Sequence, residues 1–178
     1  MNTKIIFLDI DGVLNAPNYW RFWWWNLLNR MGFKTELADD TSIERRFVRR
    51  LNWIVRRANA HIVISSAWRH RFPDWMQWLH LFTSMGFPSV GNAVIGTTVS
   101  HAPSVKRGAE IQGWLDRPEK RPECRRIPEP ISAYVILDDD SDMTPQQKSG
   151  HFVQTNPYKG LTRKDCRRAL KILRRNEA

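Results

Sequence analysis

The sequence predicts an α/β fold in which helices cover both faces of a doubly wound, mainly parallel central sheet, giving a three-layer sandwich. Two observations support this. Short apolar runs without alternation, such as Ile5–Leu8 and Ile62–Ile64, are typical of strands buried on both faces. Segments with apolar residues at helical spacing lie between such runs. In open sheets of this kind, ligands bind beyond the carboxyl ends of the strands.

Composition limits the function. With 178 residues, 42% of them hydrophobic, the chain suits one domain (1–178) with a substantial core. We expect a cytoplasmic protein without a disulfide, because Cys124 and Cys166 have neither metal nor redox spacing and no segment resembles a signal or a membrane span. The net charge of +10 favours a nucleic acid partner if the basic residues cluster, although a merely soluble basic surface explains it about as well.

The first strand ends in two acids. Ile5–Leu8 is followed by Asp9-Ile10-Asp11-Gly12, and strand alternation places Asp9 and Asp11 on the same side before Gly12 turns the backbone away. Two carboxylates this close repel each other unless a cation lies between them. Taken alone, the pattern also fits a calcium loop fragment or a plain turn at the end of a strand.

The next segment, 16–40, is long for a connection and is expected to form a small lid beside the site. It is rich in tryptophan, at Trp20, Trp23, Trp24 and Trp25. Stacking of bases on Trp20 or Trp23 is one interpretation, and packing of the lid on the core is the favoured one.

Residues 41–58 form the clearest predicted helix. Thr41 and Glu44 fit a capping box. The apolar face comprises Ile43, Phe47, Leu51, Ile54 and Ala58, and the opposite face carries Arg45, Arg46, Arg49, Arg50, Arg56, Arg57 and Trp53. That opposite face is either an ordinary solvated surface or a platform for a single-stranded nucleic acid.

The second predicted strand, 61–65, ends in Ser65-Ser66-Ala67-Trp68-Arg69. The serine hydroxyls and the Arg69 guanidinium are donors suited to a phosphate, although a serine here is also an ordinary helix cap. A helix over 73–85 and a strand over 93–98 follow.

A basic residue then begins a helix near 105–115, and either Lys106 or Arg107 fits. A cation at a helix start is unfavourable, so an anion nearby would explain it. A Pro- and charge-rich loop over 116–130 separates this helix from the strand Tyr134–Leu137, which ends in Asp138-Asp139-Asp140-Ser141-Asp142. An acidic surface turn is the alternative to a cation site there. A short strand over 151–155 and a helix capped by Thr162 and Asp165 complete the chain.

These segments resemble, in order, the four motifs of the haloacid dehalogenase-like phosphohydrolases. The stretches FLDIDGVLN, ISSAWR, RGAEIQGWL and YVILDDDSDM are similar to the compact phosphatase-like domain of bacterial and phage RNA-repair proteins. The resemblance implies a Rossmann-like core with a minimal cap.

The resemblance also implies roles for individual residues. Asp9 would attack phosphorus and become an aspartyl-phosphate, and Asp11 would protonate the leaving oxygen and later activate water. Ser65 would hydrogen-bond the transferred phosphoryl group, and Lys106 or Arg107 would neutralise charge. Mg²⁺ would be held by Asp9, the backbone carbonyl of Asp11 and Asp139, with Asp138 and Asp142 in support. The expected substrate contacts are Gly12, Ser66, Arg69, Trp20 and Trp23.

The sequence therefore predicts a Mg²⁺-dependent phosphatase acting on phosphomonoesters, with the 3′-phosphate of a nucleic acid end as the preferred substrate. A nucleotidase for free (deoxy)nucleoside monophosphates is the close alternative. A non-catalytic nucleic-acid-binding protein and a dehalogenase acting on carbon are further alternatives. The last two would leave the acids after the first and fourth strands without a purpose.

Overall fold

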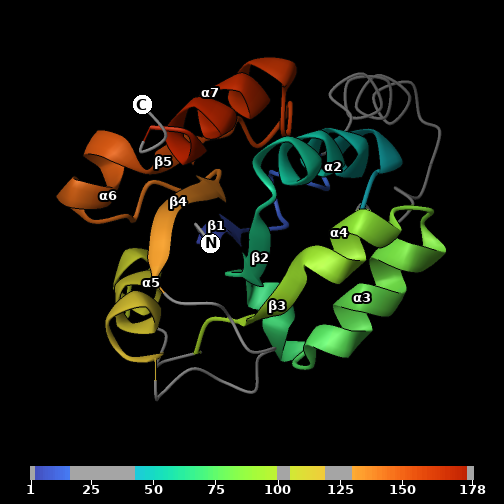
Figure 1. Ribbon diagram of the computed structural model, residues 1–178, viewed down its shortest axis with the longest axis horizontal. Helices are drawn as coiled ribbons and strands as arrows, with labels where there is room; N and C mark the ends of the chain where they lie inside the picture. Colours follow the sequence, from blue (N-terminus) through green and yellow to red (C-terminus); the bar gives the residue numbers. More distant parts are fainter. Residues whose placement is uncertain (1–2, 17–42, 100–104, 119–129, 176–178) are drawn as a thin grey trace, which may run out of the picture.

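The computed structural model describes residues 3–16, 43–99, 105–118 and 130–175. Its centre is a five-stranded sheet in the order β3-β2-β1-β4-β5, in which every pairing is parallel (Figure 1). The strands are β1 (Thr3–Leu8), β2 (His61–Ile64), β3 (Val94–Thr97), β4 (Ile131–Asp138) and β5 (Phe152–Gln154). The predicted doubly wound sheet is confirmed, with β1 at its centre.

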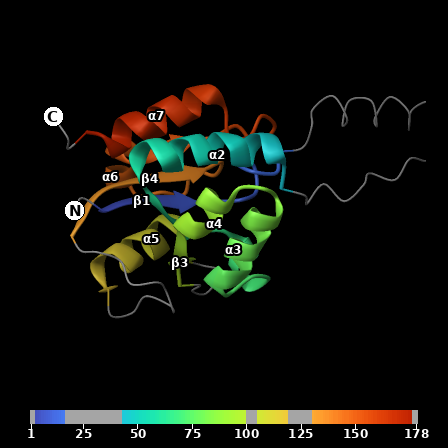
Figure 2. The ribbon, with the colours of Figure 1, turned by 45° about the vertical axis from the view of Figure 1, so that its right-hand side comes forward.

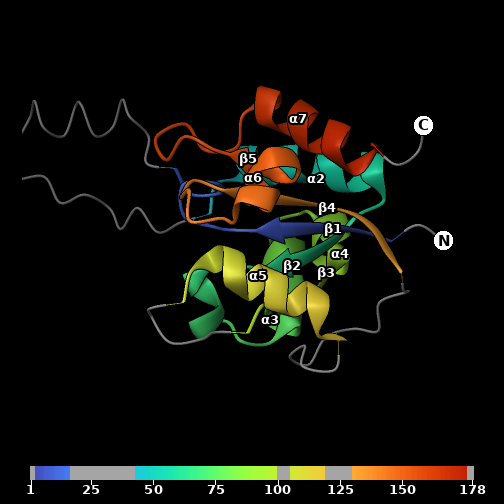
Figure 3. The same cartoon turned by 90° about the vertical axis from the view of Figure 1, so that its left-hand side faces the viewer.

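Helices cover both faces of this sheet. On one face α2 (Arg45–Ala58) and α7 (Arg163–Leu173) lie side by side (Figure 2). On the other face α5 (Arg107–Asp116) packs Ile111 and Trp114 against the sheet (Figure 3). Two helices, α3 (Trp75–Ser84) and α4 (Pro88–Ala93), pack against each other and against β3.

Strand alternation divides the core into two parts. Ile6 and Leu8 of β1 point into the larger part, with α2 and α7, while Ile5 and Phe7 point into the smaller part, with α5. All four side chains are fully buried. Burial on both faces explains why β1 reads as a continuous apolar run and fixes where its next residue, Asp9, emerges.

The helix boundaries correct one prediction. α2 begins at Arg45, and Glu44 is its N-cap residue without a side-chain capping bond, so the capping box predicted for Thr41 and Glu44 is wrong. The Glu44 carboxylate instead pairs with Arg46 at 2.7 Å. The capping box at Thr162 and Asp165 is confirmed at the start of α7. A similar box, between Asp74 and Gln77, begins α3.

Short helical turns were not predicted. These are η1 (Ala67–His70), α4 and α6 (Pro145–Gly150), which span four to six residues each. A segment of that length shows too few turns of helical periodicity to be recognised in a sequence. Among the described residues, no helix is long and apolar enough to cross a membrane.

Several predictions lie outside the described residues. They concern nearly all of the proposed lid at 16–40, including Trp20 and Trp23, most of the loop at 116–130, and Cys124.

Candidate active site

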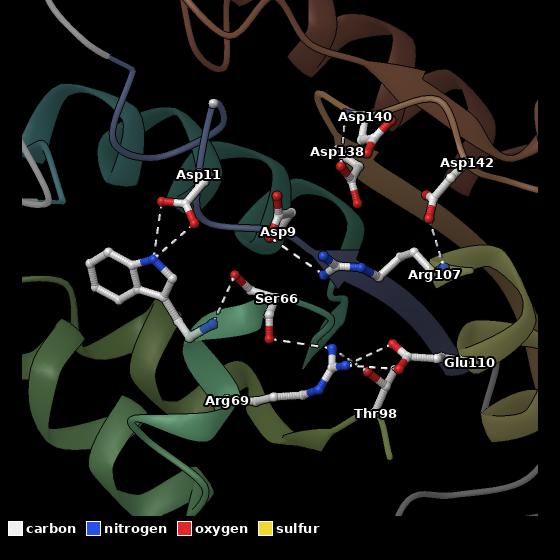
Figure 4. Close-up of polar contacts among 12 residues, drawn as sticks. Asp9, Asp11, Ser66, Arg69, Thr98, Arg107, Glu110, Asp138, Asp140 and Asp142 are labelled. Carbon is white, nitrogen blue, oxygen red and sulfur yellow. Dashed lines mark hydrogen bonds and ion pairs between the residues drawn. The ribbon is translucent and has the colours of Figure 1, made fainter. Parts of the chain in front are cut away.

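Asp9 lies where the central strand ends. The Asp9 N–H donates to the Leu137 carbonyl at 2.9 Å, and the Ser65 N–H donates to the Leu8 carbonyl at 2.8 Å. These bonds align the ends of β4, β1 and β2, so side chains from all three strands meet at one edge of the sheet (Figure 4). The Asp9 side chain is buried.

The loop after Asp9 is held by its own side chains. Gly12 has φ of +62°, and its N–H donates to Asn15 Oδ1 at 3.1 Å. Asn15 Nδ2 in turn donates to Asp11 Oδ1 at 2.6 Å, and Thr155 Oγ1 donates to the Gly12 carbonyl at 3.0 Å. Neither Asn15 nor Thr155 was recognised in the sequence as part of this site. The closeness of Asn15 to the Asp-x-Asp-Gly pattern was the one available signal.

Asp11 has a second partner, Trp68 of η1. Trp68 Nε1 donates to both carboxylate oxygens of Asp11, at 3.0 and 3.1 Å. The Asp11 carboxylate is exposed and held in one orientation by Trp68 and Asn15. Its side chain is not part of the acidic cluster below, and the ligand expected from Asp11 is its backbone carbonyl. Trp68 lies within the ISSAWR stretch, but its role was not foreseen.

Three acids converge beside Asp11. Asp9, Asp138 and Asp139 each offer a carboxylate oxygen, and these oxygens lie within 4.8 Å of one another. Asp138 is buried, and its Oδ1 accepts the Asp140 N–H at 2.9 Å. Gly12 makes room for Asp139, since a Cβ at Gly12 would lie 2.4 Å from the Asp139 carboxyl carbon.

The acids in this cluster resist ionisation. Burial raises the pKa of Asp138 to about 8, with a further increase from the charge of Asp9. Burial likewise raises the pKa of Asp9 to about 6, although Arg107 and the Ser66 hydroxyl act to lower it. The pKa of Asp139 is also raised by burial. Three oxygen donors that repel one another when charged form a suitable site for a hard divalent cation such as Mg²⁺.

Arg107, the first residue of α5, brings a positive charge to Asp9. Its Nη1 lies 3.5 Å from Asp9 Oδ1, and its backbone N–H donates to Asp142 Oδ2 at 2.9 Å (Figure 4). Lys106 is the exposed N-cap residue of α5. Of the two basic residues left open by the sequence, the structure therefore places Arg107 beside Asp9. The position of α5 is set at Gly108, where a Cβ would lie 2.6 Å from Gln147 Oε1.

The two serines after β2 differ in their contacts. The Ser66 hydroxyl accepts the Trp68 N–H at 3.3 Å and acts to lower the pKa of Asp9. Ser65 is buried, and its Oγ has no hydrogen-bond partner among the described residues. Both serines thus lie at the site, and the Ser66 hydroxyl is near enough to Asp9 to influence its pKa.

Arg69 was expected to contact a substrate phosphate. In the structure its Nη2 donates to both carboxylate oxygens of Glu110, at 2.9 and 2.8 Å, and both side chains are buried. Arg69 Nη1 also donates to the Ser66 carbonyl at 3.3 Å. The Arg69 guanidinium therefore pairs with Glu110 through Nη2, and this ion pair ties the segment after β2 to α5. Glu110 was not recognised in the sequence.

Several buried polar atoms around Asp9 lack a hydrogen bond to any described residue. They are Ser65 Oγ, Arg69 Nε, Arg107 Nη1 and Asp142 Oδ1. A buried polar atom without a partner costs about 1–3 kcal/mol, so such atoms are uncommon unless a ligand satisfies them. Ser65 and Arg107 both offer donors to an oxyanion. This supports a site that holds a phosphate beside a cation.

Comparison with known protein families matches residues 5–166 to the family described as the HAD domain in Swiss Army Knife RNA repair proteins. HAD denotes the haloacid dehalogenase-like superfamily. The matched range contains every residue of the site described above. Searches among curated proteins and among solved structures gave no match.

The raised pKa values predict how stability depends on pH. Burial raises the pKa of Asp9 to about 6 and that of Asp138 to about 8, against an ordinary value of 3.8. At pH values between the ordinary and the raised pKa, the metal-free folded state therefore binds more protons than the unfolded state does. The free energy of unfolding should therefore fall as pH rises, by on the order of 5 kcal/mol between pH 5 and pH 8. Urea denaturation in the presence of a chelator measures this free energy at each pH. Adding Mg²⁺ should restore more stability at pH 8 than at pH 5.

Asp138→Asn is the control for this prediction, because an amide carries no charge at either pH. This variant should lose most of the pH dependence and most of the stabilisation by Mg²⁺. If the free energy of unfolding changed with pH equally in the variant and the wild type, the raised pKa of Asp138 would not be the cause of the pH dependence.

Gly12 predicts a separate effect on the metal. Gly12→Ala would push the Asp139 carboxyl out of the cluster, so Mg²⁺ affinity measured by calorimetry should fall by about 10-fold or more. Gly86→Ala is a matched control, because Gly86 also has positive φ, at +82°, while the nearest atom to its Cβ is the flexible end of Arg45. Both variants should lose about 1–2 kcal/mol of stability, whereas Gly86→Ala should bind Mg²⁺ normally. If Gly12→Ala bound Mg²⁺ with wild-type affinity, the space at Gly12 would not be needed to hold Asp139 in the metal site.

Proposed function

This chain belongs to the family of HAD domains found in Swiss Army Knife RNA repair proteins, and from that premise we propose that it is a Mg²⁺-dependent phosphatase of nucleic acid ends. The reaction is hydrolysis of a terminal phosphomonoester through an aspartyl-phosphate on Asp9. A 3′-phosphate is the preferred substrate.

One observation supports this proposal above all others. Asp9 directly follows the central strand β1 and lies beside a hydroxyl from the segment after β2, a guanidinium from α5 and two acids at the end of β4. These are a nucleophile, two kinds of donor for phosphoryl oxygens and a set of cation ligands. A protein that only bound nucleic acid would gain nothing from bringing together three mutually repelling carboxylates, two of them buried.

In the proposed reaction, an Asp9 oxygen attacks phosphorus and a new O–P bond forms while the bond to the leaving oxygen breaks. Asp11 gives a proton to the leaving oxygen. Water then attacks phosphorus, its proton goes to Asp11, and the bond from phosphorus to Asp9 breaks. The products are an alcohol and inorganic phosphate, and both carboxyl groups return to their starting states. The bonds from Trp68 and Asn15 keep the Asp11 carboxyl in place for both transfers.

The other residues of the site stabilise charge. Arg107 and the hydroxyls of Ser65 and Ser66 would hold the phosphoryl oxygens. Mg²⁺ held by Asp9, Asp138 and Asp139 would screen the negative charge of the phosphate from the attacking carboxylate. Arg69 serves this site indirectly, because its pair with Glu110 holds the Ser66 segment against α5.

Phosphate release tests the proposal. The substrates are an oligonucleotide with a 3′-phosphate, one with a 5′-phosphate and a set of nucleoside monophosphates, each with Mg²⁺ or with a chelator. We expect release that needs Mg²⁺ and is abolished in Asp9→Asn, with the 3′-phosphorylated oligonucleotide giving the highest kcat/KM. Release that persists in the chelator would refute the mechanism, and a preference for mononucleotides would refute the choice of substrate.

Arg107 and Lys106 form a matched pair within the same assay. Arg107→Ala removes the guanidinium beside Asp9 and should lower kcat/KM by about 100-fold or more, the effect of losing one donor to a developing oxyanion. Lys106→Ala removes the same charge one residue away, on an exposed side chain, and should change kcat/KM little. If both variants lost kcat/KM equally, the overall positive charge would matter and the position of Arg107 beside Asp9 would not.

A further inference from the structure

The face formed by α2 and α7 carries a groove that the proposed reaction does not use. It has a volume of about 470 Å³ and is lined by Arg46, Arg49, Arg50, Trp53, Arg163, Cys166 and Arg167. A shallower hollow continues from it along α2 and is lined by Arg49, Asn52, Trp53, Arg56 and Arg57. We call the two together the arginine groove. Its volume falls within the range of ligand-binding clefts, about 300–1,000 Å³.

The charge of the arginine groove is nearly unopposed. No aspartate or glutamate lines either part. Among the described residues, the one carboxylate paired with a groove arginine is that of Glu44, which contacts Arg46. Arginines packed this closely without acidic partners repel one another, so an external polyanion would stabilise the surface.

The helix dipole adds to this repulsion. The first turn of α2 contains Arg45 and Arg46 and no acidic residue. Cations at this end of a helix oppose the partial positive charge of its free N–H groups, whereas an anion there is favoured. Glu44, the N-cap residue, lies beside this turn, and its carboxylate pairs with Arg46 alone among the groove arginines of the described residues.

Trp53 is an aromatic residue in the middle of the groove. Its side chain is 37% exposed, and the Arg57 guanidinium lies 5.3 Å from the centre of its ring. The neighbouring residues Leu51, Ile54 and Val55 are buried, so Trp53 lies outside the apolar face of α2. An exposed ring between arginines provides a surface on which a base stacks while the cations contact the backbone phosphates.

The arginine groove begins beside the loop that follows Asp9. The Glu44 N–H, just before α2, donates to the Leu14 carbonyl at 2.8 Å. Arg50 Nη1 donates to the Leu161 carbonyl at 2.7 Å, and the Leu161 N–H donates to the Val13 carbonyl at 2.9 Å. Both helices therefore start at the edge of the sheet where Asp9 lies and run away from it (Figure 2).

We propose that the arginine groove binds a single-stranded polynucleotide, with phosphates on its arginines and a base on Trp53. This inference rests on the proposed function, since it assigns to the groove the strand whose terminal phosphate reaches Asp9. The groove would thereby select long substrates over mononucleotides.

Binding tests the inference without requiring hydrolysis. The probe is a fluorescein-labelled single-stranded RNA oligonucleotide with a 3′-hydroxyl, titrated at several salt concentrations. Arg49→Glu/Arg167→Glu should raise Kd at least 10-fold. The slope of log Kd against log salt concentration should fall by about 1.4, which is about 0.7 for each of the two phosphates that the variant no longer neutralises. Trp53→Ala should raise Kd by about 5- to 100-fold with the slope unchanged.

Lys148→Glu/Arg117→Glu is the matched control. It changes the net charge by the same amount as the groove variant, at two exposed residues in α6 and at the end of α5 that do not line the groove. It should leave Kd within about 2-fold of wild type. All variants should hydrolyse a nucleoside monophosphate at the wild-type rate, while the groove variants should raise KM for a 3′-phosphorylated oligonucleotide. Equal weakening by groove and control variants, or none by either, would overturn the inference.

The two proposals fail in different ways. Hydrolysis of oligonucleotide ends with a KM insensitive to the groove variants would refute the groove and leave the phosphatase intact. Binding through the groove without phosphate release from any substrate would refute the phosphatase, while the groove would stand as a nucleic acid site.

Discussion

The central constraint in this protein is the cost of holding Asp9, Asp138 and Asp139 together at a buried edge of the sheet. Burial raises the pKa of all three, so the cluster is unfavourable without a compensating positive charge. The neighbouring features reduce that cost or maintain the geometry despite it. Arg107 brings charge from α5, and Gly12 leaves the space that Asp139 occupies. A cation and a phosphate would complete this compensation.

The parallel sheet is what makes the cluster possible. Segments far apart in the sequence reach one edge because β1 pairs with both β2 and β4 in the same direction. The acidic site lies at that edge, and the arginine groove starts there on an outer face. The protein therefore separates a small site suited to a cation and a phosphate from a long basic surface suited to a chain of phosphates.

The sequence predicted the strands and the acids well, because each apolar run ends directly in the residues that matter. It could not show contacts between elements. Trp68 and Asn15 orient Asp11 through side-chain hydrogen bonds, and Glu110 pairs with Arg69 from a different helix. The sequence left Lys106 and Arg107 open, whereas the position of α5, where Gly108 packs against Gln147, brings Arg107 to Asp9. The capping box at 41–44 failed because the helix begins one turn later.

The most direct test of the account is to trap a phosphorylated Asp9. Asp11→Asn is mixed with an aryl phosphate, whose leaving group departs without a proton from the protein, and the reaction is quenched in acid. With the base for the second step removed, the intermediate should accumulate, and mass spectrometry should find one phosphoryl group on the peptide containing Asp9. Phosphate release without any phosphorylated protein, or a phosphoryl group on a different residue, would contradict the central claim.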